Sequence, residues 1–199
     1  MSVSKSTGFN KKARFYSWIL IPFLVIGFIS VTWADTSIPE KKQTSLRLYM
    51  NARQAWERWS ASPDTVHIID VRTPAEYIFV GHAPMAANIP FKFLNGALNP
   101  VTLKPGMPDN KNFIADIKKR FKKTDTILVM CRSGGRSAAA VNLMAKAGFG
   151  KVYNIIDGFE GDSLKDPESY QDGKRIINGW KNSGAPWTYN LERGLVYFP

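Results

Sequence analysis

The sequence predicts an α/β protein in which helices flank a central, largely parallel β-sheet. Short β-branched runs alternate along the chain with segments whose apolar residues recur at helical spacing. The runs are apolar throughout, which is typical of parallel strands buried on both faces. In such sheets, ligands bind at the carboxyl ends of the strands.

The first elements follow the N-terminal region. Apolar residues recur every three or four positions within residues 46–59, which predicts a helix with one apolar face; they are Leu46, Tyr49, Ala52, Ala55, Trp56 and Trp59. The β-branched run Thr65–Val71 predicts a strand. The TPAEY segment then begins a helix, because Pro74 is tolerated in a first turn and Glu76 suits the positive helix N-terminus.

The remaining elements continue this alternation. In chain order, we expect a short strand at Ala86–Phe91, a helix within Lys111–Lys123, a strand at Thr126–Met130, a helix from Ser137 to Gly148 and a strand at Lys151–Asp157. Asp70, Cys131 and Asp157 come at or just after the ends of three strands, so they are expected near one edge of the sheet.

The N-terminal residues 1–34 resemble a secretory signal peptide. The apolar run Trp18–Val31 is preceded by basic residues and followed by a cleavage position after Ala34; the basic residues are Lys5, Lys11, Lys12 and Arg14. The alternative is an uncleaved membrane anchor, but a spanning helix needs about 20 apolar residues, and Pro22 and Gly27 weaken this one. Either way, we expect a periplasmic or otherwise exported domain.

The charge of the mature chain is moderately positive. The four basic residues before Ala34 leave 23 of the 27 Lys and Arg residues against 16 acidic ones, a net charge of +7. This charge favours anionic small substrates or an anionic partner surface, although it also fits an ordinary soluble surface. The Lys and Arg residues are spread out and match no nucleic-acid motif, so no nucleic-acid partner is expected.

Cys131 is the only cysteine in the chain. It has no intrachain disulfide partner, and zinc or iron–sulfur sites built from several cysteines are excluded. No metal or cofactor is predicted. The thiol is therefore buried and inert, part of an intermolecular bridge, or a reactive nucleophile.

The surroundings of Cys131 favour the nucleophile. The stretch CRSGGRS, residues 131–137, lies between a strand and a helix, so its backbone N–H groups and the helix dipole can stabilise a thiolate. Gly134 and Gly135 permit the backbone angles of such a turn. Arg132 and Arg136 supply fork-shaped donors for an oxyanion.

CRSGGRS resembles the active-site loop of rhodanese-like sulfurtransferases. Three further motifs of that family occur in the same order: IIDVRTPAEY (Ile68–Tyr77), GHAPMAANIP (Gly81–Pro90), and GFEGD followed by GWKNSGAP (Gly179–Pro186). The resemblance implies a rhodanese-like domain over residues 45–199. Met85 and Glu160 replace usual glycines, and insertions near 95–110 and 161–178 could wall the active site.

The resemblance also implies a sulfurtransferase of the thiosulfate type with specific roles for the loop. Cys131 would accept a sulfane sulfur from thiosulfate, a persulfide or a polysulfide, and pass it to cyanide or to a thiol on a small molecule or protein. The expected substrate-binding residues are Arg132, Ser133, Gly134, Gly135 and Arg136. Supporting roles are expected for Asp70, Arg72 and Ser137, with Arg72 and Glu76 forming a bracing ion pair.

Other interpretations stay open. The domain could be a binding or delivery module for a periplasmic redox partner, with little or no catalysis. A phosphatase or arsenate reductase is a lesser alternative, because related phosphatases place five residues, not four, between cysteine and arginine. A Cys–His protease has little support, since His82 belongs to a structural turn of the family and His67 is expected to be a core residue.

Overall fold

The computed structural model describes Met1 and residues 38–198. The predicted signal peptide therefore lies outside the described residues, except for Met1. By its internal contacts the chain divides into Met1–Thr36 and Ser37–Pro199, and the sheet with its helices belongs to the second unit. Within residues 38–198, no helix is both long and apolar enough to cross a membrane.

The described residues form a sheet of five parallel strands in the order β1-β5-β4-β2-β3. The strands are β1 (Tyr49–Met50), β2 (Val66–Asp70), β3 (Ala87–Asn88), β4 (Thr126–Met130) and β5 (Val152–Ile155). The predicted α/β class with a parallel sheet is confirmed.

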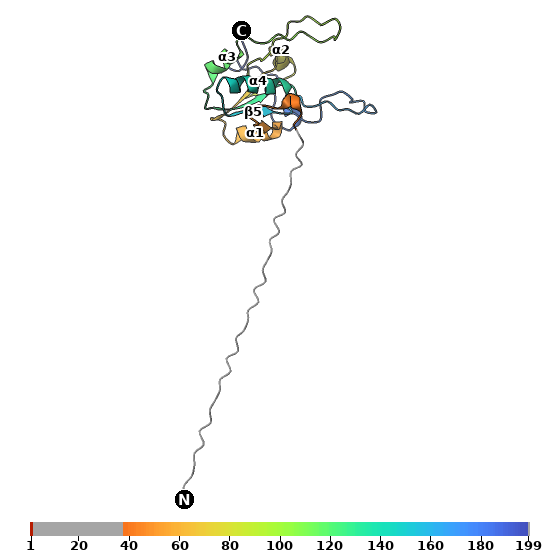
Figure 1. The fold of residues 1–199 in the computed structure, drawn as a ribbon. Coiled ribbons are helices and arrows are strands. Elements are labelled where there is room, and N and C mark those ends of the chain that lie inside the picture. The colour runs from red at the N-terminus through yellow and green to blue at the C-terminus, as the bar shows by residue number, and fades with distance from the viewer. Residues whose placement is uncertain (2–37, 199) are drawn as a thin grey trace. The chain divides into compact units, whose positions relative to one another are not determined.

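Helices cover both faces of this sheet, with α1 on one side and α4 on the other (Figure 1). The helices are α1 (Ala52–Ser60), α2 (Pro74–Phe79), α3 (Phe113–Arg120) and α4 (Gly135–Lys146), with short 3-10 helices η1 (Glu40–Lys42) and η2 (Trp180–Asn182). Successive residues of a strand point to opposite faces. Accordingly, Ile68 packs in the core under α1, and Ile69 packs in the core under α3 and α4.

The first predicted helix is wrong in its N-terminal half. Tyr49–Met50 instead pairs with β5 as an edge strand, and Arg47 has a φ of 53°, which a helix does not permit. The helix begins only at Ala52, because the Asn51 side chain accepts from the Gln54 N–H while the Gln54 side chain accepts from the Asn51 N–H. This capping box outweighs the helical spacing further upstream.

The two predicted insertions extend from the domain as separate loops, one green and one blue in Figure 1. Residues 95–110 form a hairpin-like excursion with antiparallel bridges Lys92 to Asp109 and Leu98 to Pro105. Residues 161–178 form another, bridged from Ser163 to Arg175. The first loop lies between β3 and α3 and the second follows β5, the last strand, so neither loop interrupts a strand of the sheet.

Candidate active site

Cys131 directly follows β4, and α4 begins at Gly135. The Gly134 N–H donates a hydrogen bond to the Cys131 Sγ over 3.2 Å. Asp70 ends β2, and Asp157 follows β5, so the predicted meeting of these strand ends at one sheet edge is confirmed. Cys131 is only 2% exposed, and a reactant must therefore enter the loop to reach its sulfur.

The loop rests on the turn that follows β5. The Phe159 N–H donates to the Cys131 carbonyl over 2.7 Å, and the Glu160 N–H donates to the Arg132 carbonyl over 3.0 Å. These bonds hold the backbone of Cys131 and Arg132 against this turn. The GFEGD segment therefore acts as the base of the cysteine loop.

Two glycines make this close approach possible. Gly134 has a φ of 93°, and a Cβ atom there would lie 2.1 Å from the Ile156 carbonyl oxygen. A Cβ atom at Gly158 would lie 2.4 Å from the Cys131 carbonyl oxygen. Any side chain at these positions would push the loop away from β5.

Asn154, in the middle of β5, organises the other side of the loop. Its amide donates to the carbonyl oxygens of Gly134, over 3.1 Å, and Lys42, over 3.0 Å. Its Oδ1 lies 2.6 Å from the Ser137 Oγ, which is itself 3.4 Å from the Cys131 Sγ. The Ser137 hydroxyl has a single proton, which it can donate either to the Asn154 Oδ1 or to the Cys131 Sγ.

Sequence reasoning missed Asn154. The only available signal was a polar residue inside the apolar run KVYNIID, and nothing in that pattern indicated what it would bind. Ser137, by contrast, was named from the sequence, and its hydroxyl lies next to the sulfur.

Arg136 is held by Glu76 rather than left free for a substrate. Its Nη1 and Nη2 donate to the two carboxylate oxygens of Glu76 over 2.7 and 2.6 Å. Burial alone would raise the pKa of Glu76, but the hydrogen bonds and charge of Arg136 outweigh it and lower the pKa to about 2. The predicted pairing of Glu76 with Arg72 is wrong.

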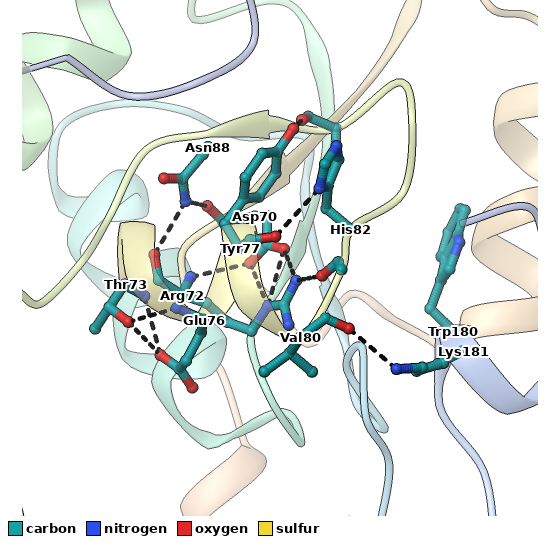
Figure 2. Close-up of polar contacts among 12 residues, drawn as sticks. Asp70, Arg72, Thr73, Glu76, Tyr77, Val80, His82, Asn88, Trp180 and Lys181 are labelled. Atoms are coloured by element: carbon teal, nitrogen blue, oxygen red, sulfur yellow. Dashed lines mark hydrogen bonds and ion pairs between the residues drawn. The ribbon is translucent and has the colours of Figure 1, made fainter. Parts of the chain in front are cut away.

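Arg72 instead pairs with Asp70, and both side chains are fully buried. The Arg72 Nη2 donates to the Asp70 Oδ2 over 2.6 Å and to the Gly81 carbonyl over 2.7 Å, as Figure 2 shows. The guanidinium also lies over the Phe159 ring at 4.0 Å. Asp70 and Arg72 thus support the base of the loop. Because Arg72 pairs with Asp70, the Glu76 carboxylate is free to pair with Arg136.

Glu76 is kept in place by its own helix. The Thr73 N–H and hydroxyl both donate to the Glu76 Oε2, and the Glu76 N–H donates to the Thr73 Oγ1 (Figure 2). This capping box begins α2 and directs the carboxylate toward Arg136. Local sequence rules identified the helix start but not the partner across the fold.

Arg132 and Ser133 differ from the rest of the loop in their exposure. Arg132 is exposed and Ser133 is half-buried. Among the described residues, no hydrogen bond or ion pair engages the guanidinium of Arg132, which makes it the free cation of the loop. Gly135, the remaining predicted binding residue, begins α4.

The two histidines lie in different environments. His82 is buried, and its Nδ1 lies 3.1 Å from the Tyr77 carbonyl, with the rings stacked 3.9 Å apart (Figure 2). These contacts fit the structural role predicted for it. His67 was expected in the core, but its side chain is 36% exposed and faces Asp125, because it lies at the open N-terminal side of β2.

Asp157 has a structural part at the same edge. Its carboxylate accepts from the backbone N–H groups of Ala52, over 2.8 Å, and Gly179, over 3.0 Å. Burial raises the pKa of Asp157 despite these bonds. The residue joins the end of β5 to the start of α1 and to the point where the second insertion returns.

A comparison with protein families supports the motif assignment. Residues 52–165 match the family model of the rhodanese-like domain, more than half of the chain. The chain belongs to the rhodanese-like family.

Relatives of this rhodanese-like protein include plant and bacterial proteins. It is 37% identical over 91 residues to "Thiosulfate sulfurtransferase 16, chloroplastic" of Arabidopsis thaliana, covering 46% of this chain and 68% of the relative. It is 36% identical over 123 residues to an uncharacterized protein of Rickettsia prowazekii, covering 61% of this chain and 82% of the relative.

A solved structure agrees with the family. The crystal structure of Rv0390 from M. tuberculosis has 31% sequence identity and a TM-score of 0.56, and the match covers 71% of this chain and 96% of that one. The rhodanese-like fold is thus established by sequence motifs, by the family match and by structure.

Proposed function

We propose that this rhodanese-like protein is an exported sulfurtransferase that carries sulfane sulfur on Cys131. The observation that carries the proposal is the hydrogen bond from the Gly134 N–H to the Cys131 Sγ, within a strand–turn–helix loop. An N–H directed at sulfur, next to a helix N-terminus, stabilises the thiolate and then the terminal sulfur of a persulfide. The donor is thiosulfate, a persulfide or a polysulfide.

The reaction takes place in two steps. With thiosulfate, the Cys131 thiolate attacks the sulfane sulfur; a new S–S bond forms, the donor S–S bond breaks, and sulfite leaves with the electron pair. The enzyme then holds a Cys131 persulfide. A thiolate or cyanide attacks the outer sulfur, and the Cys131 thiolate leaves.

The acceptor supplies its own nucleophile. Cys131 is the only cysteine in the sequence, so no second thiol of this chain can take the sulfur as an internal disulfide. A small thiol, a thiol on a partner protein, or cyanide completes the cycle. The free cation Arg132 attracts anionic reactants to the loop.

Export forms part of the proposal because of residues 1–34. Their basic start, apolar run and alanine-containing end support a cleaved signal and a periplasmic location. The N-terminal sequence of the protein recovered from the periplasmic fraction tests this: it should begin near Asp35. Recovery of the full-length chain with the membrane fraction would favour the uncleaved anchor.

Intact-protein mass spectrometry tests the chemistry. The wild-type protein and Cys131→Ser are incubated with thiosulfate or polysulfide, and the expected result is a gain of one sulfur atom in the wild type only. Cyanide or a thiol should remove that sulfur. A reduced, folded wild-type protein that gains no sulfur from either donor would exclude the proposed activity.

A second candidate rests on the burial of the thiol. Because Cys131 is 2% exposed, the domain could instead dock on a periplasmic redox partner and transfer little sulfur. The rate of Cys131 alkylation at neutral pH distinguishes the two functions. Rapid labelling favours the sulfurtransferase, whereas labelling as slow as that of a core thiol favours the docking module.

A further inference from the structure

A cavity of about 290 Å³ lies beside the cysteine loop. Arg132, Arg136 and Glu76 contribute polar groups to its lining. Leu94, just before the first insertion, and Pro105 and Met107 within it contribute apolar ones. Its volume is near the lower end of the roughly 300–1,000 Å³ found for small-molecule pockets. An inorganic sulfur anion with a handful of non-hydrogen atoms would leave much of it unfilled.

The apolar side of the cavity is held in position by the hairpin. The Phe93 N–H donates to the Pro108 carbonyl over 2.9 Å, and the Asn95 N–H donates to the Gly106 carbonyl over 3.2 Å. These bonds join the two arms just where Leu94 and Met107 project. Leu94, which is 46% exposed, and Met107 therefore lie on the paired part of the hairpin, and Pro105 lies nearer its turn.

The charges around the cavity select for one kind of ligand. Glu76 compensates the charge of Arg136 through two hydrogen bonds, so Arg132 is the arginine of the lining whose charge no carboxylate compensates. A small dianion would meet one free cation and an apolar surface that cannot replace its hydration. An organic anion can place a carboxylate near Arg132 and its carbon chain against Leu94 and Met107.

We propose that this cavity binds the carbon chain of a carboxylate-bearing organic persulfide, and that Leu94 and Met107 determine the preference for it over inorganic thiosulfate. The inference rests on the proposed sulfurtransferase function. In the loading step, the Cys131 thiolate attacks the outer sulfur of R–S–SH. The bond between the Cys131 sulfur and the outer sulfur forms, the S–S bond of the donor breaks, and R–S⁻ leaves with the electron pair while the proton stays on the transferred sulfur.

The test compares rates of Cys131 persulfide formation with two donors, glutathione persulfide and thiosulfate. Met107→Ser should lower the second-order rate with glutathione persulfide about five- to tenfold, because the lost apolar contact is worth that much discrimination. The rate with thiosulfate should stay within about twofold. Met107→Leu, which keeps an apolar side chain of similar size, should restore the organic donor rate.

Leu103→Ser is the matched control. Leu103 belongs to the same hairpin, is 72% exposed and does not line the cavity, so its substitution should change neither rate. Circular dichroism and the melting temperature establish that each variant is folded.

The outcomes separate the two proposals. If both donors load wild-type Cys131 and Met107→Ser leaves the glutathione persulfide rate unchanged, or lowers both donor rates equally, the cavity assignment is wrong and the sulfurtransferase function stands. If neither donor loads folded, reduced wild-type protein, both proposals are overturned.

Discussion

Glu76 and Arg136, separated by 60 positions in the chain, form a two-point ion pair that joins α2 to the first turn of α4. Their side chains are 22% and 18% exposed, so the pair is only weakly screened by solvent. It fixes the end of the cysteine loop, and the Glu76 carboxylate compensates the positive charge of Arg136 at the cavity. Arg132 is thereby the arginine of the loop that we propose to attract anionic reactants.

The ion pair should make stability depend on pH in the acid range. The pKa of Glu76 falls from 4.5 to about 2 on folding, so its contribution is complete above the unfolded value and is lost as pH falls through the folded one. Between about pH 5 and pH 2, we expect Glu76→Gln to lose less stability than the wild type, by on the order of 3 kcal/mol. Urea unfolding at several pH values measures this difference; parallel curves for both proteins would contradict it.

Alanine substitutions at Gly134 and Gly135 should have opposite effects on stability. A Cβ at Gly134 would meet the Ile156 carbonyl at 2.1 Å and force a positive φ on alanine, so Gly134→Ala should cost more than about 2 kcal/mol and abolish sulfur loading. A Cβ at Gly135 would meet only the Lys41 carbonyl, at 3.7 Å. Gly135→Ala should therefore be neutral or slightly stabilising. Thermal unfolding of the two variants, side by side, makes the comparison.

Asn154 should be essential to the loop although it does not contact the sulfur. Asn154→Ala removes the partners of the Gly134 and Lys42 carbonyls and of the Ser137 hydroxyl. Unpaired buried groups cost about 1–3 kcal/mol each, so we expect at least that loss of stability and slower Cys131 alkylation or persulfide formation.

The control for Asn154 is Asn142→Ala. Asn142 accepts one exposed hydrogen bond, from the Ser45 N–H, so its loss should cost less than about 1 kcal/mol. Equal effects of the two substitutions on stability would show that Asn154 has no special role.

The contributions of Arg72 and Asp70 to the free energy of unfolding should be coupled. Arg72→Met leaves the buried carboxylate of Asp70 without its cation, which typically costs about 3–5 kcal/mol. The double variant Asp70→Asn with Arg72→Met should be less destabilised than Arg72→Met alone, because no charge stays buried. A double-mutant cycle from denaturant unfolding tests this coupling, and strictly additive losses would be inconsistent with it.

Arg132 and Arg136 should contribute in different ways. Arg132→Gln removes the free cation and should lower the rate of loading by anionic donors about tenfold with an unchanged melting temperature. Arg136→Gln removes a buried partner of Glu76 and should lower the melting temperature. Stopped-flow loading and thermal unfolding of both variants distinguish recognition of the substrate from support of the loop.

Sequence alone determined the α/β class, the strand that delivers Cys131 and the loop that surrounds it. These features depend on short-range patterns: buried β-branched runs, a glycine-containing turn and a following helix. Boundaries held where local signals were strong, as at the Thr73 cap of α2. They failed at Leu46 and Tyr49, whose helical spacing was overridden by pairing of β1 with β5.

Only the tertiary structure decided which side chains meet. The sequence predicted an ion pair between Glu76 and Arg72. In the structure Glu76 pairs with Arg136, because Arg72 is buried against Asp70. Asn154 binds the loop because β5 packs against the cysteine loop. Met107 lines the cavity because the hairpin folds back toward Arg132. Local propensity specifies an element from its own residues, whereas these contacts join segments far apart in the chain and exist only after the sheet has formed.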